Sequence, residues 1–244
     1  MRETDIFVRN KEHNTFPIIH HCPEDMPNKI WFDLERIRGS YSASICKPDD
    51  LTIITFNNTP RPMLLEKRLN ASNTEYLLLG KEVQPWTNPA KIDLLVEHLP
   101  KVSTKYVLVM DDIDVIISSN IGSILQTFHT FDCKVLYNSS SVIYPKENKY
   151  SEIETTLCDD RFRHLNSGCF IGYTDYCLEL YREALAFNDA ITTKHYHSDQ
   201  IKLKAMYVAK HPEIRLDSKA RIFQVWNVKG GKCEDILEIC YKSL

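Results

Sequence analysis

The sequence has little glycine and no excess of charge of either sign. Its 244 residues include 7 glycines, 30 Lys and Arg, and 33 Asp and Glu, which gives a formal net charge of −3. Glycine this scarce excludes a fibrous repeat, and a composition of 43% hydrophobic and 26% charged residues excludes a chain disordered in bulk. The near balance of charge excludes the strongly basic surface typical of nucleic-acid-binding proteins, so we expect no nucleic-acid partner.

Long apolar runs and targeting signals are also missing. A helix needs about 18 or more mostly apolar residues to cross a membrane, and no such stretch occurs. Residues 1–12 lack the apolar core of a signal peptide. We therefore expect no membrane span and a cytoplasmic location. The 8 cysteines include no C-x-x-C pair, which argues against a zinc knuckle, and we expect reduced, structural thiols.

Short apolar runs alternate with amphipathic segments from residue 51 onward. The runs 51–56, 76–79, 106–110, 134–137, 169–172 and 221–225 predict strands, and the segments 61–69, 89–99, 121–128, 175–187 and 198–208 predict helices. This order predicts an α/β fold whose central sheet is mostly parallel and carries helices on both faces. We expect one domain over 51–244, with the turn-rich residues 1–50 as an N-terminal extension packed on it.

Three carboxylates follow the strand predicted at 106–110. Asp111, Asp112 and Asp114 lie where the carboxyl end of a parallel strand gathers ligands. Clustered carboxylates repel one another unless a cation or hydrogen-bond donors offset their charge. Because Mg²⁺ and Mn²⁺ prefer carboxylate oxygens and complete their shells with phosphate oxygens, the pattern predicts a metal that holds a diphosphate. The alternative is a solvated turn whose aspartates cap the next helix.

Two later segments are also candidates for a ligand site. Asn166, Ser167 and Gly168 precede a short strand, where small residues allow a ligand to approach the backbone and Asn166 can donate to a sugar hydroxyl. Asp199 lies at the start of a predicted helix, where it can act as a general base or bind a sugar hydroxyl. Each segment also has a purely structural explanation, as an ordinary turn or as the first turn of a helix.

Taken together and in this order, these segments resemble the glycosyltransferase domain at the N-terminus of the collagen lysyl hydroxylases. The resemblance covers about 51–227. Asp111-Asp112-Ile113-Asp114 is similar to the Asp-x-x-Asp turn of that family, residues 165–172 to its Leu-Asn-Ser-Gly-Gly-Phe-Ile-Gly stretch, and residues 221–224 match its Arg-Ile-Phe-Gln. The family's acidic run before Asp-Gln is similar to residues 195–200.

The resemblance implies a GT-A-like nucleotide-sugar transferase fold and a set of site residues. It implies that Asp111 and Asp114 bind Mn²⁺ or Mg²⁺ and that Asp199 is catalytic. The donor, a UDP-sugar, would contact the remaining site residues, which are Thr55, Asp112, Ile113, Asn166, Ser167 and Gly168.

The sequence departs from the family pattern at three places. Ile113 replaces an aromatic residue, Asp199 is the acid that remains of the acidic run, and no histidine follows His211 to complete the metal shell.

We therefore predict a metal-dependent glycosyltransferase that moves a hexose from a UDP-sugar to a hydroxyl of a glycan, peptide or small-molecule acceptor. Two alternatives stay open. One is a non-catalytic sugar-binding or partner-binding module of the same fold, which the departures at Ile113 and at the missing histidine favour. The other is a metal-dependent phosphohydrolase or nucleotidyltransferase, since these enzymes also use clustered aspartates.

Overall fold

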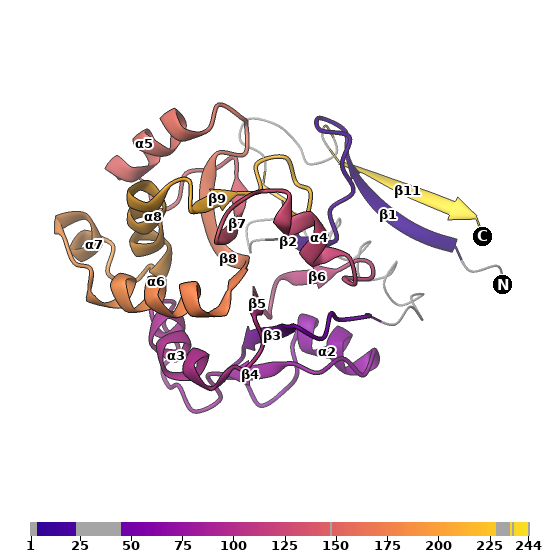
Figure 1. The fold of residues 1–244 in the computed structure, drawn as a ribbon, viewed down its shortest axis with the longest axis horizontal. Helices are drawn as coiled ribbons and strands as arrows, with labels where there is room; N and C mark the ends of the chain where they lie inside the picture. Colours follow the sequence, from indigo (N-terminus) through magenta and orange to yellow (C-terminus); the bar gives the residue numbers. More distant parts are fainter. Residues whose placement is uncertain (1–3, 23–44, 147, 228–234, 236, 244) are drawn as a thin grey trace.

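The computed structural model describes residues 4–22, 45–146, 148–227, 235 and 237–243. Within them a mixed sheet with the strand order β4-β3-β5-β8-β7-β9 forms the centre of the fold (Figure 1). Its strands are β3 (Leu51–Phe56), β4 (Leu77–Leu79), β5 (Tyr106–Asp111), β7 (Val135–Ser140), β8 (His164–Tyr173) and β9 (Ile214–Leu216).

Strands β3 and β5 are built almost entirely from buried β-branched and apolar residues, as strands covered on both faces require. They pair in parallel, with Leu51 beside Tyr106 and Phe56 beside Asp111. Strand β8 runs antiparallel to both β5 and β7, whereas β4 and β9 are parallel to their neighbours. The predicted mostly parallel sheet is therefore confirmed, with β8 as the reversed strand.

Helices cover both faces of this sheet, as predicted. On one face α3 (Ala90–His98), α6 (Thr174–Ala186) and α8 (Asp199–Lys210) share a hydrophobic core with the strands. On the other face the core is closed by α2 (Leu64–Ala71), by α4 (Ile124–His129) and by a small second sheet. The remaining helical segments are η1 (Leu99–Lys101), α5 (Lys149–Leu157) and α7 (Ala190–Lys194).

The small second sheet contains a strand from the N-terminal segment. Strand β2 (Ile19–His21) lies between β6 (Val115–Ile117), to which it is antiparallel, and β10 (Phe223–Val225), to which it is parallel. Strand β1 (Thr4–Asn10) pairs with β11 (Leu237–Ser243) along one side of the molecule (Figure 1). The predicted extension thus contributes β1 and β2, and its residues 23–44 lie outside the described residues.

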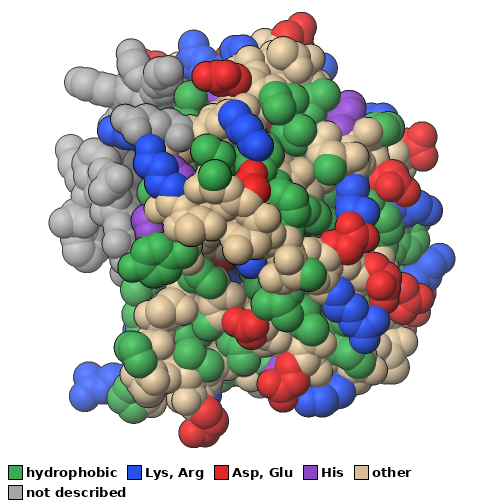
Figure 2. All heavy atoms as spheres, turned by 90° about the vertical axis from the view of Figure 1, so that its left-hand side faces the viewer, with side chains coloured by type: hydrophobic (Ala, Val, Ile, Leu, Met, Phe, Trp, Pro, Cys, Tyr) green, Lys and Arg blue, Asp and Glu red, His purple; other side chains and the backbone are tan. Residues whose placement is uncertain are grey.

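Strand β8 is much longer than the predicted strand 169–172. It begins at His164, so Asn166, Ser167 and Gly168 lie inside a strand and not in a turn before it. The reason is its partner β7, which resumes pairing at Asn138↔Asn166 after a shift in register at Tyr137. Over the described residues, none of the helices is long and apolar enough to span a membrane. Acidic and basic side chains are interspersed over the face that Figure 2 shows.

Candidate functional site

A cavity of about 660 Å³ opens at the carboxyl ends of β3 and β5. Its size is typical of small-molecule sites, and its position is the one that ligands occupy in open α/β sheets. Most of the residues predicted for the site line it, namely Asp111, Asp112, Ile113, Asp114, Asn166, Ser167, Gly168 and Asp199. The acidic turn, the Asn-Ser-Gly segment and Asp199 come from three separate parts of the sequence and meet in this one cavity.

The two outer aspartates of the turn form a cluster with a histidine that the sequence analysis did not assign. Suitable ligand atoms of His21, Asp111 and Asp114 all lie within 4.8 Å of one another. His21 Nε2 is 3.0 Å from Asp114 Oδ2. The other carboxylate oxygen of Asp114, Oδ1, is buried and has no hydrogen-bond partner among the described residues. A buried carboxylate that has one oxygen without a hydrogen bond and lies close to a second carboxylate and an imidazole is a suitable place for a cation.

The His21 ring packs directly against Gly168. A Cβ atom at position 168 would lie 2.5 Å from the Cε1 atom of His21, so the ring occupies the space that any larger side chain would need. Asn138 also approaches the ring, with its Nδ2 atom 3.5 Å from Nδ1. Burial alone would raise the pKa of Asp114, but His21 outweighs it and holds that pKa below the usual value.

Lys91 supplies a positive charge to the same cluster. It lies in the first turn of α3, and its Nζ donates to Asp111 Oδ1 at 2.5 Å. Burial would lower the pKa of the Lys91 ammonium, but the nearby carboxylates of Asp111, Asp199 and Asp114 raise it above the usual value. Burial also raises the pKa of Asp111, and Lys91 opposes that rise. In the donor-free protein, the cluster therefore combines carboxylates with the Lys91 ammonium.

The middle residues of the turn face differently from the outer pair. Asp112 Oδ1 accepts from the backbone N–H of Glu66 at 2.8 Å, so this carboxylate caps the amino end of α2. Burial raises the pKa of Asp112 to about 7; the backbone N–H of Glu66 opposes this rise, and the Glu66 carboxylate adds to it. Ile113 is 52% exposed at the rim of the cavity. Asp112 therefore does cap a helix, but it caps the earlier helix α2 and not the next helix along the chain, and its side chain also lines the cavity.

The opposite wall is built from β8 and the start of α8. Asp199 is buried in the first turn of α8, and Gln200 follows it. Gln200 Oε1 accepts from the backbone N–H of Ser167 at 3.2 Å, which ties the helix to the strand. Asn166 Oδ1 accepts from the Gly168 N–H at 3.0 Å, so its amide nitrogen is turned away from that bond. This wall offers amide, hydroxyl and carboxylate groups suited to sugar hydroxyls.

Thr55 is the one predicted residue that does not line the cavity. It is fully buried, and its hydroxyl donates to the Met110 carbonyl of the neighbouring strand at 2.8 Å. The residues that follow it, Phe56 and 57–59, do line the cavity. The end of β3 is thus at the site, although the Thr55 side chain serves the sheet.

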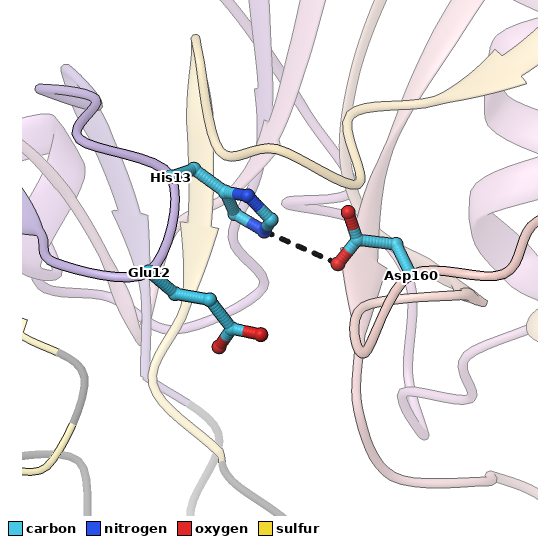
Figure 3. Close-up of side chains that lie close together, drawn as sticks. All are labelled: Glu12, His13 and Asp160. Atoms are coloured by element: carbon cyan, nitrogen blue, oxygen red, sulfur yellow. Dashed lines mark hydrogen bonds and ion pairs between the residues drawn. The ribbon is translucent and has the colours of Figure 1, made fainter.

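A second group of possible metal ligands lies outside the cavity lining. Glu12 and His13 from the turn after β1 face Asp160 from the loop before β8 (Figure 3). His13 Nε2 is 3.1 Å from Asp160 Oδ1, and Arg161 Nε lies 3.5 Å from Glu12 Oε2. The carboxylates of Asp160 and Glu12 thus each have a partner in His13 or Arg161, which is sufficient to explain the cluster.

Comparison with known proteins identifies the type of domain. The family model described as the PLOD GT domain matches residues 74–238, well over half of the chain. The chain belongs to this family of glycosyltransferase domains. The matched range contains the acidic turn, the Asn-Ser-Gly segment and Asp199, whereas His21 lies outside it.

Two relatives of this glycosyltransferase domain share 26% identity with it. One is an uncharacterized protein, R699, of Acanthamoeba polyphaga mimivirus, aligned over 70% of the chain. The other is a procollagen-lysine,2-oxoglutarate 5-dioxygenase of Drosophila melanogaster, aligned over 67% of the chain. The aligned regions cover only 38% of the viral protein and 22% of the fly protein.

Sequence reasoning missed three side chains of the site in this glycosyltransferase domain: His21, Lys91 and Gln200. A weak signal for His21 existed, because Ile18-Ile19-His20-His21 is a short β-branched run that ends in two histidines. Nothing local in the sequence brings that run to the acidic turn, since His21 and Asp114 are 93 residues apart. Lys91 gave no signal, because one lysine on an amphipathic helix is ordinarily a solvated surface residue.

Proposed function

We propose that this glycosyltransferase domain moves a hexose from a nucleoside-diphosphate sugar, with UDP as the nucleotide, to a hydroxyl of a glycan, peptide or small-molecule acceptor. We further propose that it requires Mn²⁺ or Mg²⁺. The observation that carries the proposal is the cluster of His21, Asp111 and Asp114 inside a cavity at the carboxyl ends of the strands. A divalent ion held there would supply the positive charge that a leaving diphosphate needs.

The residues present fit such an ion. Neighbouring ligands in an octahedral shell with bonds of about 2.1 Å lie about 3 Å apart. His21 Nε2 and Asp114 Oδ2 are 3.0 Å apart, so the same spacing serves a hydrogen bond or two adjacent ligands. We propose His21 as the third protein ligand beside Asp111 and Asp114, and the imidazole favours Mn²⁺ over Mg²⁺. It would take the place of the histidine that the family supplies after Arg-Ile-Phe-Gln.

The chain's own groups would position the donor and the acceptor. We propose that Asn166 and Ser167 bind hydroxyls of the sugar and that Asp199 lies beside the reacting carbon. In the reaction, the acceptor oxygen bonds to the anomeric carbon and the bond from that carbon to the phosphate oxygen breaks. If Asp199 takes the acceptor proton, the displacement is single and the anomeric configuration inverts. If Asp199 instead binds the sugar, retention is open to the enzyme, so the anomer of the product distinguishes the two roles.

The test is calorimetric titration of the protein with UDP, with and without Mn²⁺. The variants are Asp111→Ala, Asp114→Ala and His21→Ala, with His13→Ala as the matched control because it removes the histidine of the second cluster. We expect metal-dependent binding in the wild type and in His13→Ala, and a loss of at least about tenfold in each of the other three. A subsequent screen of UDP-sugars would identify the donor by release of UDP on addition of acceptors.

Two results would contradict the proposal. Absence of UDP binding in the folded wild type, at any metal concentration, would exclude the UDP assignment. Wild-type affinity in Asp114→Ala would favour the non-catalytic module, because such a module does not depend on the metal ligands. Circular dichroism melts of each variant separate loss of binding from loss of folding.

A further inference from the structure

Lys91 already occupies the carboxylate that the proposed metal would bind. Its Nζ lies 2.5 Å from Asp111 Oδ1, and the side chains of the pair are only 12% and 19% exposed. Because this ion pair is short and has little contact with solvent, it holds the ammonium firmly against one carboxylate oxygen. The inference below rests on the proposed function, since it concerns how Lys91 and a divalent ion share that oxygen-rich site.

A divalent ion and the Lys91 ammonium would compete for Asp111. An ion bound to Asp111 with a bond of about 2.1 Å would lie within a few ångströms of Nζ, where the two positive charges repel strongly because little water screens them. Lys91 must then swing away, and a lysine can do so without backbone movement because its charge sits on a flexible four-carbon stem.

The cavity offers the ammonium a second anionic partner when the donor binds. Lys91 and Asn88 both line the cavity from the amino end of α3, whose partial positive charge favours an anion. Among the described residues lining the cavity, the lysines are Lys91 and Lys146, and Lys91 is the one paired with a carboxylate of the metal cluster. A diphosphate held by the metal would therefore lie within reach of the displaced ammonium.

We propose that Lys91 is an exchangeable counter-ion, which neutralises Asp111 in the donor-free protein and moves to the diphosphate of the donor when the metal binds. In this arrangement the metal competes with Lys91 for Asp111 as long as no nucleotide is present. Once nucleotide is present, Lys91 has a better partner and the competition ends. The metal and the nucleotide each strengthen binding of the other, by the same factor in both directions.

This coupling distinguishes a Lys91 that exchanges partners from a Lys91 that forms a purely structural ion pair. If Lys91 is removed, Asp111 has no competing cation, so the metal alone should bind more tightly. The nucleotide loses a cationic contact, so UDP should bind less tightly in the presence of metal. A lysine that only stabilised the fold would give neither of these opposite changes, because its loss would weaken both ligands or leave both unchanged.

The experiment measures Mn²⁺ binding by electron paramagnetic resonance without nucleotide, and UDP binding by calorimetry at saturating Mn²⁺. The variants are Lys91→Met and Lys91→Gln, so that one poorly folding variant does not end the test. Lys101→Met is the control, because it removes an exposed lysine just beyond α3 with the same change of net charge. We expect Mn²⁺ alone to bind at least about fivefold more tightly to both Lys91 variants and UDP at least about fivefold less tightly. Lys101→Met should match the wild type in both measurements.

Unchanged or weaker binding of Mn²⁺ alone to a folded Lys91 variant would overturn the exchange, even where the wild type binds UDP with metal. If the wild type binds no UDP in the presence of Mn²⁺, the proposed function itself fails. The two failures are therefore distinguished within one set of titrations.

Discussion

Replacement of Gly168 by alanine tests whether the position of His21 sets the affinity of the site. The added Cβ would lie 2.5 Å from Cε1, 2.9 Å from Nδ1 and 3.0 Å from Nε2 of His21. Carbon atoms pack at about 3.5–4.0 Å, so the ring must retreat by roughly 1 Å. Metal–ligand distances vary by only about 0.2 Å, so this displacement removes the imidazole from the proposed shell.

We expect Gly168→Ala to lower the metal-dependent affinity for UDP by about tenfold or more. Overpacking of the same contact should lower the free energy of unfolding by about 1–3 kcal/mol. Titration with UDP at fixed Mn²⁺ measures the first effect, and urea unfolding without metal measures the second. Gly122→Ala is the control, because a Cβ there meets only Asn120 Oδ1 at 3.1 Å before Cys46 O at 3.7 Å.

A double-mutant cycle tests whether Gly168 acts through His21. If Gly168 acts through His21, the double variant Gly168→Ala/His21→Ala should bind no more weakly than His21→Ala alone. Wild-type affinity in Gly168→Ala would show that the ring can move without cost to the metal, and additive losses in the double variant would show that Gly168 acts on the ligand directly.

Three further predictions concern stability and the reaction. Burial lowers the pKa of His20 to about 3, so below about pH 6.5 this residue binds a proton in the unfolded chain but not in the folded chain. The free energy of unfolding should therefore fall by roughly 2 kcal/mol between pH 7 and pH 5. In urea unfolding, His20→Gln should remove this part of the pH dependence. Lys204→Met removes the buried partner 2.5 Å from Glu154 and should cost about 3–5 kcal/mol of unfolding free energy, whereas a loss below 1 kcal/mol would mean that the remaining hydrogen bonds suffice for Glu154. Asp199→Asn should lower turnover by about 100-fold or more while UDP affinity stays within threefold, as single-turnover kinetics beside calorimetry would show, and an equal loss in both would assign Asp199 to binding.

Much of the fold could be predicted because its signals are local. Strands β3 and β5 are continuous apolar runs, and the acids that follow β5 stand out against them. Helix α5 gave no such signal, because its buried face consists of Tyr150, Ser151 and Glu154 and therefore lacks hydrophobic periodicity. Its amino end is instead fixed by Asn148, whose side chain accepts from the Ser151 N–H at 2.9 Å.

The site could be predicted only in part, because only some of its contacts are local in the sequence. Asp111 and Asp114 are close in sequence, so their proximity follows from a single turn. The sequence gives no way to separate Asp112 from them, because that depends on helix α2 lying beside the turn and receiving its carboxylate as a cap. His21 and Lys91 reach the cluster from other parts of the chain, and those approaches are set by tertiary packing, to which local pattern is insensitive.

The position of β2 between β6 and β10 has a consequence for the order in which the molecule is assembled. His21 is synthesised well before Val225, which pairs with it from more than 200 positions later in the chain and completes its part of the small sheet. The Asp-x-x-Asp turn can form as soon as β5 pairs with β3, whereas closing the loop to β10 is slow and entropically unfavourable. A nascent chain in which residue 225 has not yet been made thus has both carboxylates before the imidazole is fully fixed, and the cluster of His21, Asp111 and Asp114 is completed only after β10 has been synthesised.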